Sequence, residues 1–276
     1  MPAHSSHISL FMIGLLQSGH TFHVISSFVY SIKWQHALNG YPDPTNSVCV
    51  HLLETAKRIA KPRRRPKEPL TPAHLRTIYH TIGGYKASLL DFRNFTILLL
   101  SFAGFLRFDE AANLRRCDLA FFPTHLKIFI EGSKTDKYRD GHILLISRLN
   151  SDICPVKQAA HYLRISGLAQ EYESFLFRGL AWNGSTSSHT LRSVNQPISY
   201  STARTGCLKL VVKIGLNPND FGLHSARSGG ATAAANRGVP DRLFKRHGRW
   251  VSESAKDSYV KDNLHKLLSV SQHLGL

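Results

Sequence analysis

The chain has 276 residues, of which 42% are hydrophobic, so it can form a core and wholesale disorder is excluded. It carries 35 Lys and Arg against 18 Asp and Glu, a net charge of +17 that indicates a polyanionic partner, either nucleic acid or an acidic membrane surface. Its four cysteines lie far apart without a CxxC pair, which argues against a zinc ribbon and a disulfide scaffold.

The first 66 residues predict a small helical domain. Apolar residues at three- and four-residue steps over residues 22–32 predict a helix, which a turn over residues 39–45 ends. A second helix is predicted over residues 48–59. The apolar stretch over residues 8–16 is too short to span a bilayer and lacks the basic start and cleavage site of a signal peptide, so we expect a soluble, intracellular protein.

Residues 61–69, KPRRRPKEP, predict an extended basic linker, because three prolines prevent a regular element. Two interpretations remain open: a solvated charge run, or a strap that binds DNA through its basic side chains. The segment also resembles a nuclear localisation signal, which would place the protein in the nucleus of a eukaryotic host. The basic residues concerned are Arg63, Arg64, Arg65 and Lys67.

After the linker, the pattern predicts helices around one buried helix. Thr71 is expected to cap a helix that begins with Pro72. Residues 92–105 are apolar nearly all round, which predicts a buried helix that ends at Gly104. A further helix follows, with Asp109 as its predicted N-cap.

Alternating apolar residues predict a β-hairpin near the middle of the chain. Its strands are expected over residues 125–131 and 142–146, and the polar turn between them carries lysines at its tip. The rest of the chain is mostly helical in pattern. The predicted fold class is therefore mainly α with a small antiparallel β-sheet.

The segment over residues 221–259 carries the most informative motif. His224 and Arg227 are three residues apart near the start of a predicted helix, so both side chains can point at one anion. An HxxR pattern occurs three times in the chain. Only this copy opens a helix of small residues, which can pack close to its neighbours, and is followed by Gly238 and Pro240.

Six motif residues occur in the order of a known family. The chain resembles the tyrosine recombinases (phage integrases and Xer- and Cre-like enzymes), and among them the recombinases of eukaryotic mobile elements, over about residues 70–265 and more loosely over residues 1–66. GFLRFDEAANL resembles the first arginine motif, SKTDKYRDG the hairpin lysine motif, and HGRW the second His/Trp position, nine residues before the nucleophile. The catalytic residues that this resemblance implies are Arg107, Lys134, His224, Arg227, Trp250 and Tyr259.

Cleavage of a phosphodiester without a metal needs a nucleophile, positive charge on the phosphate oxygens, an acid and a base. The resemblance implies that Tyr259 forms a covalent 3′-phosphotyrosyl link while Arg107 and Arg227 bind the phosphate oxygens. No metal or cofactor is expected. Lys134 would be the acid that protonates the leaving 5′ oxygen, with Lys137 as a fallback. His224 would exchange a proton with the tyrosine, and Trp250 would donate its indole N–H. Glu110 would orient the arginine or the histidine.

The resemblance also implies how the chain acts on double-stranded DNA. Residues 1–66 would form a core-binding-like DNA-binding domain and residues 67–276 the catalytic domain, together a clamp around the duplex. Lys137 and Arg139 at the hairpin tip would also bind DNA. The N-terminal part is shorter than the usual core-binding domain, which suggests a missing first helix or a truncated gene model. The leucines of residues 260–276 lie at near-helical steps, which also fits a helix packed on its own domain; the resemblance implies instead that they dock on a neighbouring protomer in a homotetramer.

Three other functions remain open. A catalytically decayed or domesticated recombinase would only bind DNA, and a type IB topoisomerase-like relaxase would share the chemistry without needing a target site. A role at a membrane surface, without a spanning segment, has the least support. Taken singly, each motif residue has an ordinary structural explanation, such as Trp250 in a core or Lys134 on a solvated hairpin.

Overall fold

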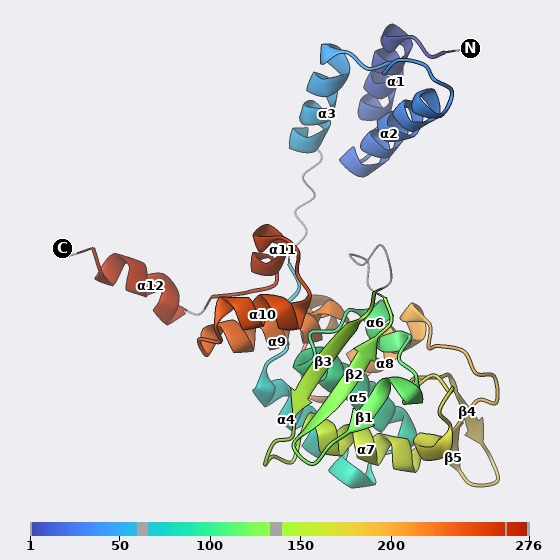
Figure 1. The fold of residues 1–276 in the computed structure, drawn as a ribbon, viewed down its shortest axis with the longest axis vertical. Helices are drawn as coiled ribbons and strands as arrows, with labels where there is room; N and C mark the ends of the chain where they lie inside the picture. The colour runs from blue at the N-terminus through green and yellow to red at the C-terminus, as the bar shows by residue number, and fades with distance from the viewer. Residues whose placement is uncertain (1, 60–65, 133–139, 263, 275–276) are drawn as a thin grey trace. The chain divides into compact units, whose positions relative to one another are not determined.

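The chain is divided into two compact units, residues 1–65 and 66–276. The computed structural model describes residues 2–59, 66–132, 140–262 and 264–274. The N-terminal unit consists of α1 (Ser5–Gln17), α2 (Phe22–Leu38) and α3 (Ser47–Ile59), so the helices predicted over residues 22–32 and 48–59 are confirmed (Figure 1). These helices share a small core, which comprises Ile8, Met12, Ile25, Val29, Cys49 and Ala56.

The core of the C-terminal unit surrounds α5 (Leu89–Ala103), the predicted buried helix. Every residue from Phe92 to Ser101 is buried, and the helix ends at Gly104, as its pattern indicates. Thr71 Oγ1 accepts the backbone N–H of His74, which confirms the predicted cap of α4 (Pro72–Thr81). The other helices are α6 (Phe108–Ala112), α7 (Pro155–Ile165), α8 (Tyr200–Lys213), α9 (His224–Asn236), α10 (Asp241–Gly248), α11 (Glu253–Asp257) and α12 (Leu264–Gln272), with short 3₁₀ turns at Gly84–Lys86, Arg116–Asp118, Leu168–Gln170 and Pro218–Asp220.

The predicted hairpin is part of a three-stranded antiparallel sheet. It is formed by β2 (His125–Ile130) and β3 (His142–Ser147), in a register that pairs Ile130 with His142. A short strand that the sequence pattern did not predict, β1 (Leu119–Phe121), pairs with β2. A second unpredicted hairpin joins β4 (Leu180–Asn183) and β5 (Ser188–Leu191). Strands of three or four residues are too short to show an alternating pattern, so only the longer pair was detectable. The fold class, mainly α with small antiparallel sheets, is confirmed.

Helix α9 packs unusually close to its neighbours because two of its residues are glycines. A Cβ atom at Gly229 would lie 2.0 Å from the carbonyl oxygen of Leu70, and one at Gly230 would lie 2.0 Å from the carbonyl oxygen of Phe102 in α5. Real side chains never approach a backbone oxygen so closely. The small residues of this helix therefore permit a contact between its backbone and α5 that any larger residue would prevent.

Substitution of Gly230 by alanine is expected to destabilise the C-terminal unit by about 3 kcal/mol, because the new methyl group meets a backbone atom that cannot rotate away. Urea denaturation of both proteins measures this free energy. Gly184→Ala is the matched control, since a Cβ atom at Gly184 meets nothing within 4 Å. Equal unfolding midpoints for Gly230→Ala and the wild type would contradict the close contact.

The end of the predicted linker is bound to the C-terminal unit rather than free. The backbone N–H of Glu68 donates to the carbonyl of Asp220 (2.7 Å), and that of Leu70 donates to the carbonyl of Ser225 (2.9 Å). Because the prolines keep this backbone extended, its N–H groups can form both hydrogen bonds, one to Asp220 before α9 and one to Ser225 in the first turn of α9. The ammonium group of Lys67 donates to the carbonyl of Asn219. Arg63, Arg64 and Arg65 lie outside the described residues.

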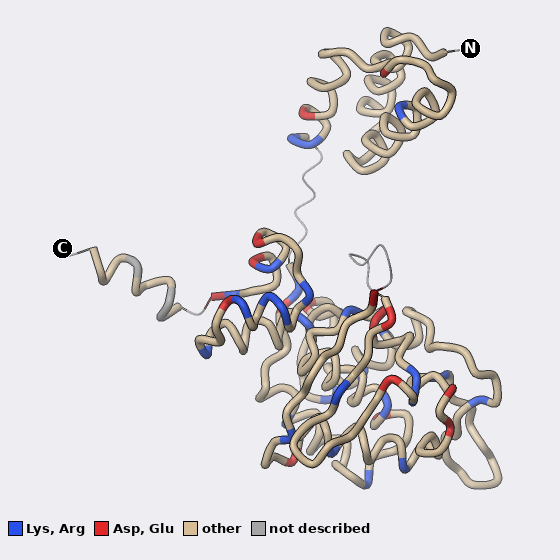
Figure 2. Tube along the Cα trace, in the orientation of Figure 1, with Lys and Arg blue, Asp and Glu red and all other residues tan. Residues whose placement is uncertain are grey.

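Basic residues occur in both units (Figure 2). In the C-terminal unit several of them follow one another along α10, namely Arg242, Lys245 and Arg246. Within the described ranges, no helix is both long and apolar enough to cross a bilayer.

Candidate active site

The site begins at a sharp turn after α5. Phe105 has a left-handed backbone with φ 47°, which is costly for a residue with a side chain. Two residues later Arg107 is the N-cap of α6, and the carboxylate of Glu110 accepts its backbone N–H at 2.8 Å. The predicted N-cap, Asp109, is therefore wrong: it lies within the first turn, because Glu110 reaches back to close the helix end.

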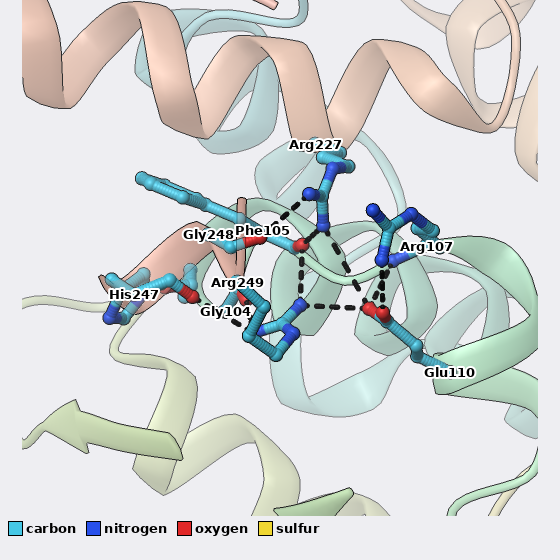
Figure 3. Close-up of polar contacts among 9 residues, drawn as sticks. Gly104, Phe105, Arg107, Glu110, Arg227, His247, Gly248 and Arg249 are labelled. Atoms are coloured by element: carbon cyan, nitrogen blue, oxygen red, sulfur yellow. Dashed lines mark hydrogen bonds and ion pairs between the residues drawn. The ribbon is translucent and has the colours of Figure 1, made fainter. Parts of the chain in front are cut away.

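The carboxylate of Glu110 lies among three arginines: Arg107, three residues before it, and Arg227 and Arg249 from distant parts of the chain (Figure 3). Its Oε1 accepts Nη1 of Arg107 at 2.7 Å, and its Oε2 accepts Nη2 of Arg249 at 2.8 Å. Nη1 of Arg227 is 3.8 Å from Oε2. Burial alone would raise the pKa of Glu110, but Arg249, the N–H of Arg107 and the charge of Arg107 outweigh it and hold the pKa below its ordinary value.

Arg227 projects from α9 and is fully buried. Its guanidinium donates to the carbonyl of Phe105 and, at 2.8 Å, to the carbonyl of Gly248. The same group lies 5.0 Å from the ring centre of Trp250 and 4.8 Å from that of Tyr259. Burial, followed by repulsion from Arg107, lowers the pKa of Arg227, but an arginine remains charged at neutral pH.

Trp250 and Tyr259 lie next to each other, with ring centres 5.7 Å apart. Trp250 is buried, and its indole N–H has no hydrogen-bond partner among the described residues. This leaves a buried donor ready for an acceptor. His247, the nearest histidine in the sequence, instead hydrogen-bonds the carbonyl of Ala103 at 2.9 Å and packs on Phe105.

A cleft of about 760 Å³ brings Arg107, Glu110, His224 and Tyr259 together. Gly132, at the end of the described part of the hairpin, lines it too. The cleft also exposes acidic groups, Asp118 and Glu131 among them. The hairpin residues Lys134, Lys137 and Arg139 lie outside the described residues.

His224 is the first residue of α9 and therefore opens onto the cleft beside Arg107. Although part of the residue is exposed, desolvation of the ring lowers the pKa of His224, and the charges of Arg227 and Arg107 lower it further. The neutral imidazole favoured at physiological pH can accept a proton.

Two contributors to this site were not predicted from the sequence. Arg249 binds Glu110 and the carbonyl of Phe105, and Phe105 supplies the carbonyl that Arg227 and Arg249 share. The sequence carried one sign of the role of Arg249, which is its position between Gly248 and Trp250 in the HGRW motif. The role of Phe105 depends on its left-handed backbone, which no motif signals.

A model of the phage integrase family matches residues 68–265, more than half of the chain. The chain belongs to the phage integrase family. A curated member of similar sequence is an integrase/recombinase XerD homologue of Selenomonas ruminantium. It is 27% identical over 242 residues, which cover 86% of this chain and 67% of that protein.

Solved structures with a similar fold are tyrosine recombinases. The Tn1549 transposon integrase, in complex with transposon right-end DNA, has a TM-score of 0.61 at 14% identity, over 99% of this chain and 86% of that one. A lambda integrase dimer bound to a COC′ core site has a TM-score of 0.57 at 16% identity, over 94% and 65%. XerH recombinase bound to a difH substrate has a TM-score of 0.57 at 14% identity; the match covers 77% of this chain but only 54% of XerH. The tyrosine recombinase fold of the phage integrase family is therefore confirmed.

Proposed function

We propose that the protein is a site-specific DNA recombinase that cleaves and rejoins strands through a covalent 3′-phosphotyrosyl intermediate, without a metal ion. The observation that carries this proposal is the arrangement of Arg107, Arg227 and Tyr259 in one chain. Arg107 and Tyr259 line one cleft, and the buried Arg227 guanidinium lies 4.8 Å from the ring centre of Tyr259 and 3.8 Å from the carboxylate of Glu110, which also binds Arg107. Two positively charged forks beside a tyrosine match the charge and shape of a phosphodiester under attack. The likeness to recombinases of eukaryotic mobile elements stays a prediction.

In this mechanism Tyr259 Oη forms a bond to the scissile phosphorus while the bond from phosphorus to the 5′ oxygen breaks. His224, whose lowered pKa favours the neutral ring, accepts the tyrosine proton. Lys134 supplies a proton to the departing 5′ oxygen. Arg107 and Arg227 carry the positive charge that the phosphate oxygens require. The second half-reaction reverses these steps with a 5′ hydroxyl from another strand.

The unpartnered indole N–H of Trp250 adds a further donor for a phosphate oxygen. Glu110 acts through the arginines, since its carboxylate is almost fully buried and is bound to the guanidinium groups of Arg107 and Arg249. Double-stranded DNA as the substrate is supported by the net charge of +17 and by the DNA complexes of the structural relatives. Such a substrate implies an intracellular location, in the nucleus if the host is a eukaryote.

Nicked suicide substrates test this function. They are built from the DNA that flanks the coding region, where inverted or direct repeats would mark the target. We expect a protein–DNA adduct that survives denaturing detergent. DNA binding without an adduct on any nicked substrate would instead support a decayed or domesticated recombinase, and relaxation of a plasmid without the flanking DNA would support a type IB topoisomerase-like enzyme.

We also propose that the chain acts as a homotetramer on DNA, in which α12 of one copy docks on the next. Four leucines at the end of the chain are exposed, and a separate apolar groove of about 350 Å³ is lined by residues of α5, α9 and α10. Burial of leucine side chains in an apolar groove is favourable. The leucines are Leu264, Leu267, Leu268 and Leu274, and the groove includes Phe102, Ala234, Val239, Leu243 and Phe244.

Substitution of Leu264 and Leu267 by aspartate is expected to reduce assembly on DNA at least tenfold, because charged groups cannot be buried in the groove. Adduct formation on a single half-site should remain. Gel-shift titration with one and two half-sites measures the two effects separately. Unchanged assembly, in this variant or after truncation behind Tyr259, would contradict docking between copies.

A further inference from the structure

Arg249 has a backbone conformation that suits glycine better than arginine. It is the C-cap of α10, with φ 56° and ψ 39°, in the left-handed region. Helices commonly end with a glycine in this conformation, because a Cβ atom makes it costly. An arginine at this position therefore requires a compensating gain from its side chain.

That gain is visible in the contacts of the buried guanidinium. Nη1 donates to the carbonyls of Gly104 (3.2 Å) and His247 (2.9 Å). Nη2 donates to the carbonyl of Phe105 and to Oε2 of Glu110, both at 2.8 Å. The side chain is only 5% exposed, and Arg249 is absent from the described residues that line the cleft. All four hydrogen bonds of the Arg249 guanidinium are thus made to groups that hold the site, namely the Glu110 carboxylate and three backbone carbonyls.

These contacts connect two strained points of the backbone. Phe105 and Arg249 both have positive φ, and a hydrogen bond joins the guanidinium of one to the carbonyl of the other. The same carbonyl accepts Arg227. Because Arg107 follows Phe105 by two residues, Arg249 fixes both the turn that presents Arg107 and the oxygen that receives Arg227.

Charge gives a second reason why Arg249 matters. Three guanidinium groups surround the single carboxylate of Glu110, so the group retains two positive charges in excess. Without Arg249, Oε2 of Glu110 would lose its closest guanidinium, and Arg227, now 3.8 Å away, could move into a direct ion pair. In an arginine bound tightly to Glu110, the carboxylate compensates the positive charge and occupies N–H groups that could otherwise bind a phosphate.

We propose that Arg249 is a positioning residue, which binds Glu110 and the Phe105 carbonyl and thereby keeps Arg107 and Arg227 available to the scissile phosphate. The proposal rests on the recombinase function proposed above. It assigns Arg249 no contact with DNA.

The test is Arg249→Gly, since glycine accepts the left-handed backbone and favours folding. Thermal unfolding checks that the variant folds. We expect its single-turnover cleavage rate to fall about 100-fold, as for a misplaced catalytic group, with DNA affinity within about twofold of the wild type. Guanidinium chloride at millimolar concentration should restore part of the rate, whereas sodium chloride of equal ionic strength should not. Cleavage at the wild-type rate would overturn the proposal.

Arg249→Lys keeps a positive charge but cannot reproduce the fork of four contacts, so we expect an intermediate rate. If Arg249→Gly does not fold, this variant decides, and a full rate for Arg249→Lys overturns the proposal. The pH dependence of its cleavage rate should also change. A weaker partner for Glu110 raises the pKa of that carboxyl, so the loss of cleavage rate in acid should begin at a higher pH than in the wild type.

Crystal structures of the wild type and the folded variant give a readout that needs no cleavage. We expect the separation between Arg227 and Glu110 to shrink from 3.8 Å to hydrogen-bond distance in the variant. Unchanged positions of Arg107 and Arg227 would overturn the proposal even if the wild type cleaves DNA. If the wild type forms no adduct while the arginines move as expected, the recombinase function fails and the positioning role stands.

Discussion

Tyr259→Phe is expected to abolish covalent protein–DNA adducts on a suicide substrate while DNA affinity stays within about twofold. The variant removes only the oxygen that we propose as the nucleophile, and the ring that packs on Trp250 and faces Arg227 remains. Detergent-resistant adducts on denaturing gels measure the first quantity, and gel-shift titration the second.

Tyr200→Phe is the matched control, because Tyr200 lines the same cleft and is half exposed. This variant should form adducts normally. Adducts that persist in Tyr259→Phe and disappear in Tyr200→Phe would move the nucleophile to the start of α8. Adducts that persist in both variants would exclude either tyrosine as the nucleophile.

Glu110→Gln is expected to lower the free energy of unfolding by about 3 kcal/mol at neutral pH. The amide can still accept a hydrogen bond, but the only carboxylate that faces Arg107, Arg227 and Arg249 within the described contacts is then lost. Removal of one partner from a buried ionic group leaves the remaining charges uncompensated. Urea denaturation measures the change, and Asp109→Asn, an exposed neighbour in the same helix, should stay close to wild type.

The difference in the free energy of unfolding between the wild type and Glu110→Gln is expected to depend on pH. The pKa of Glu110 is lower in the folded state than its ordinary value of 4.5, so its ionisation stabilises the fold fully above that value. This stabilisation is lost as the pH falls through the lowered pKa of the folded state. The difference between wild type and Glu110→Gln should therefore shrink progressively in acid. A difference that grows as the pH falls would contradict the ion-pair geometry.

The sequence allowed the helices α2, α3 and α5 to be predicted because their apolar residues repeat over many positions. The buried helix α5 and the capped start of α4 follow directly from periodicity and from Thr71 with Pro72. The N-cap of α6 could not be predicted correctly, since aspartate is a preferred N-cap residue and arginine is not. Only the hydrogen bond from the backbone N–H of Arg107 to the carboxylate of Glu110 shows that the helix begins after Arg107 and not after Asp109. The shortest strands carry no period long enough to detect.

The candidate site was only partly accessible to sequence reasoning. The spacing of the motifs identified Arg227 and Tyr259, and the structure places them within 4.8 Å of each other, guanidinium to ring centre. The contact of Arg249 with Phe105 joins positions 144 residues apart, and it depends on two left-handed backbones. Neither the separation nor the conformation is encoded in a local pattern.

Tyr259 enters the cleft on a segment that is attached to α9. Thr232 Oγ1 donates to the carbonyl of Tyr259 at 3.3 Å and accepts the N–H of Lys261 at 3.1 Å, and Asn236 binds the carbonyl of Lys261. The helix that carries His224 and Arg227 therefore also anchors Tyr259, the proposed nucleophile, of the same chain. In a recombinase built this way each subunit cuts its own strand, and a subunit that lacks one reagent cannot borrow it from a neighbour. Mixed assemblies of two variants, each lacking a different one of these residues, would remain inactive. In assemblies that also contain wild-type chains, the number of strands cut would equal the number of wild-type subunits.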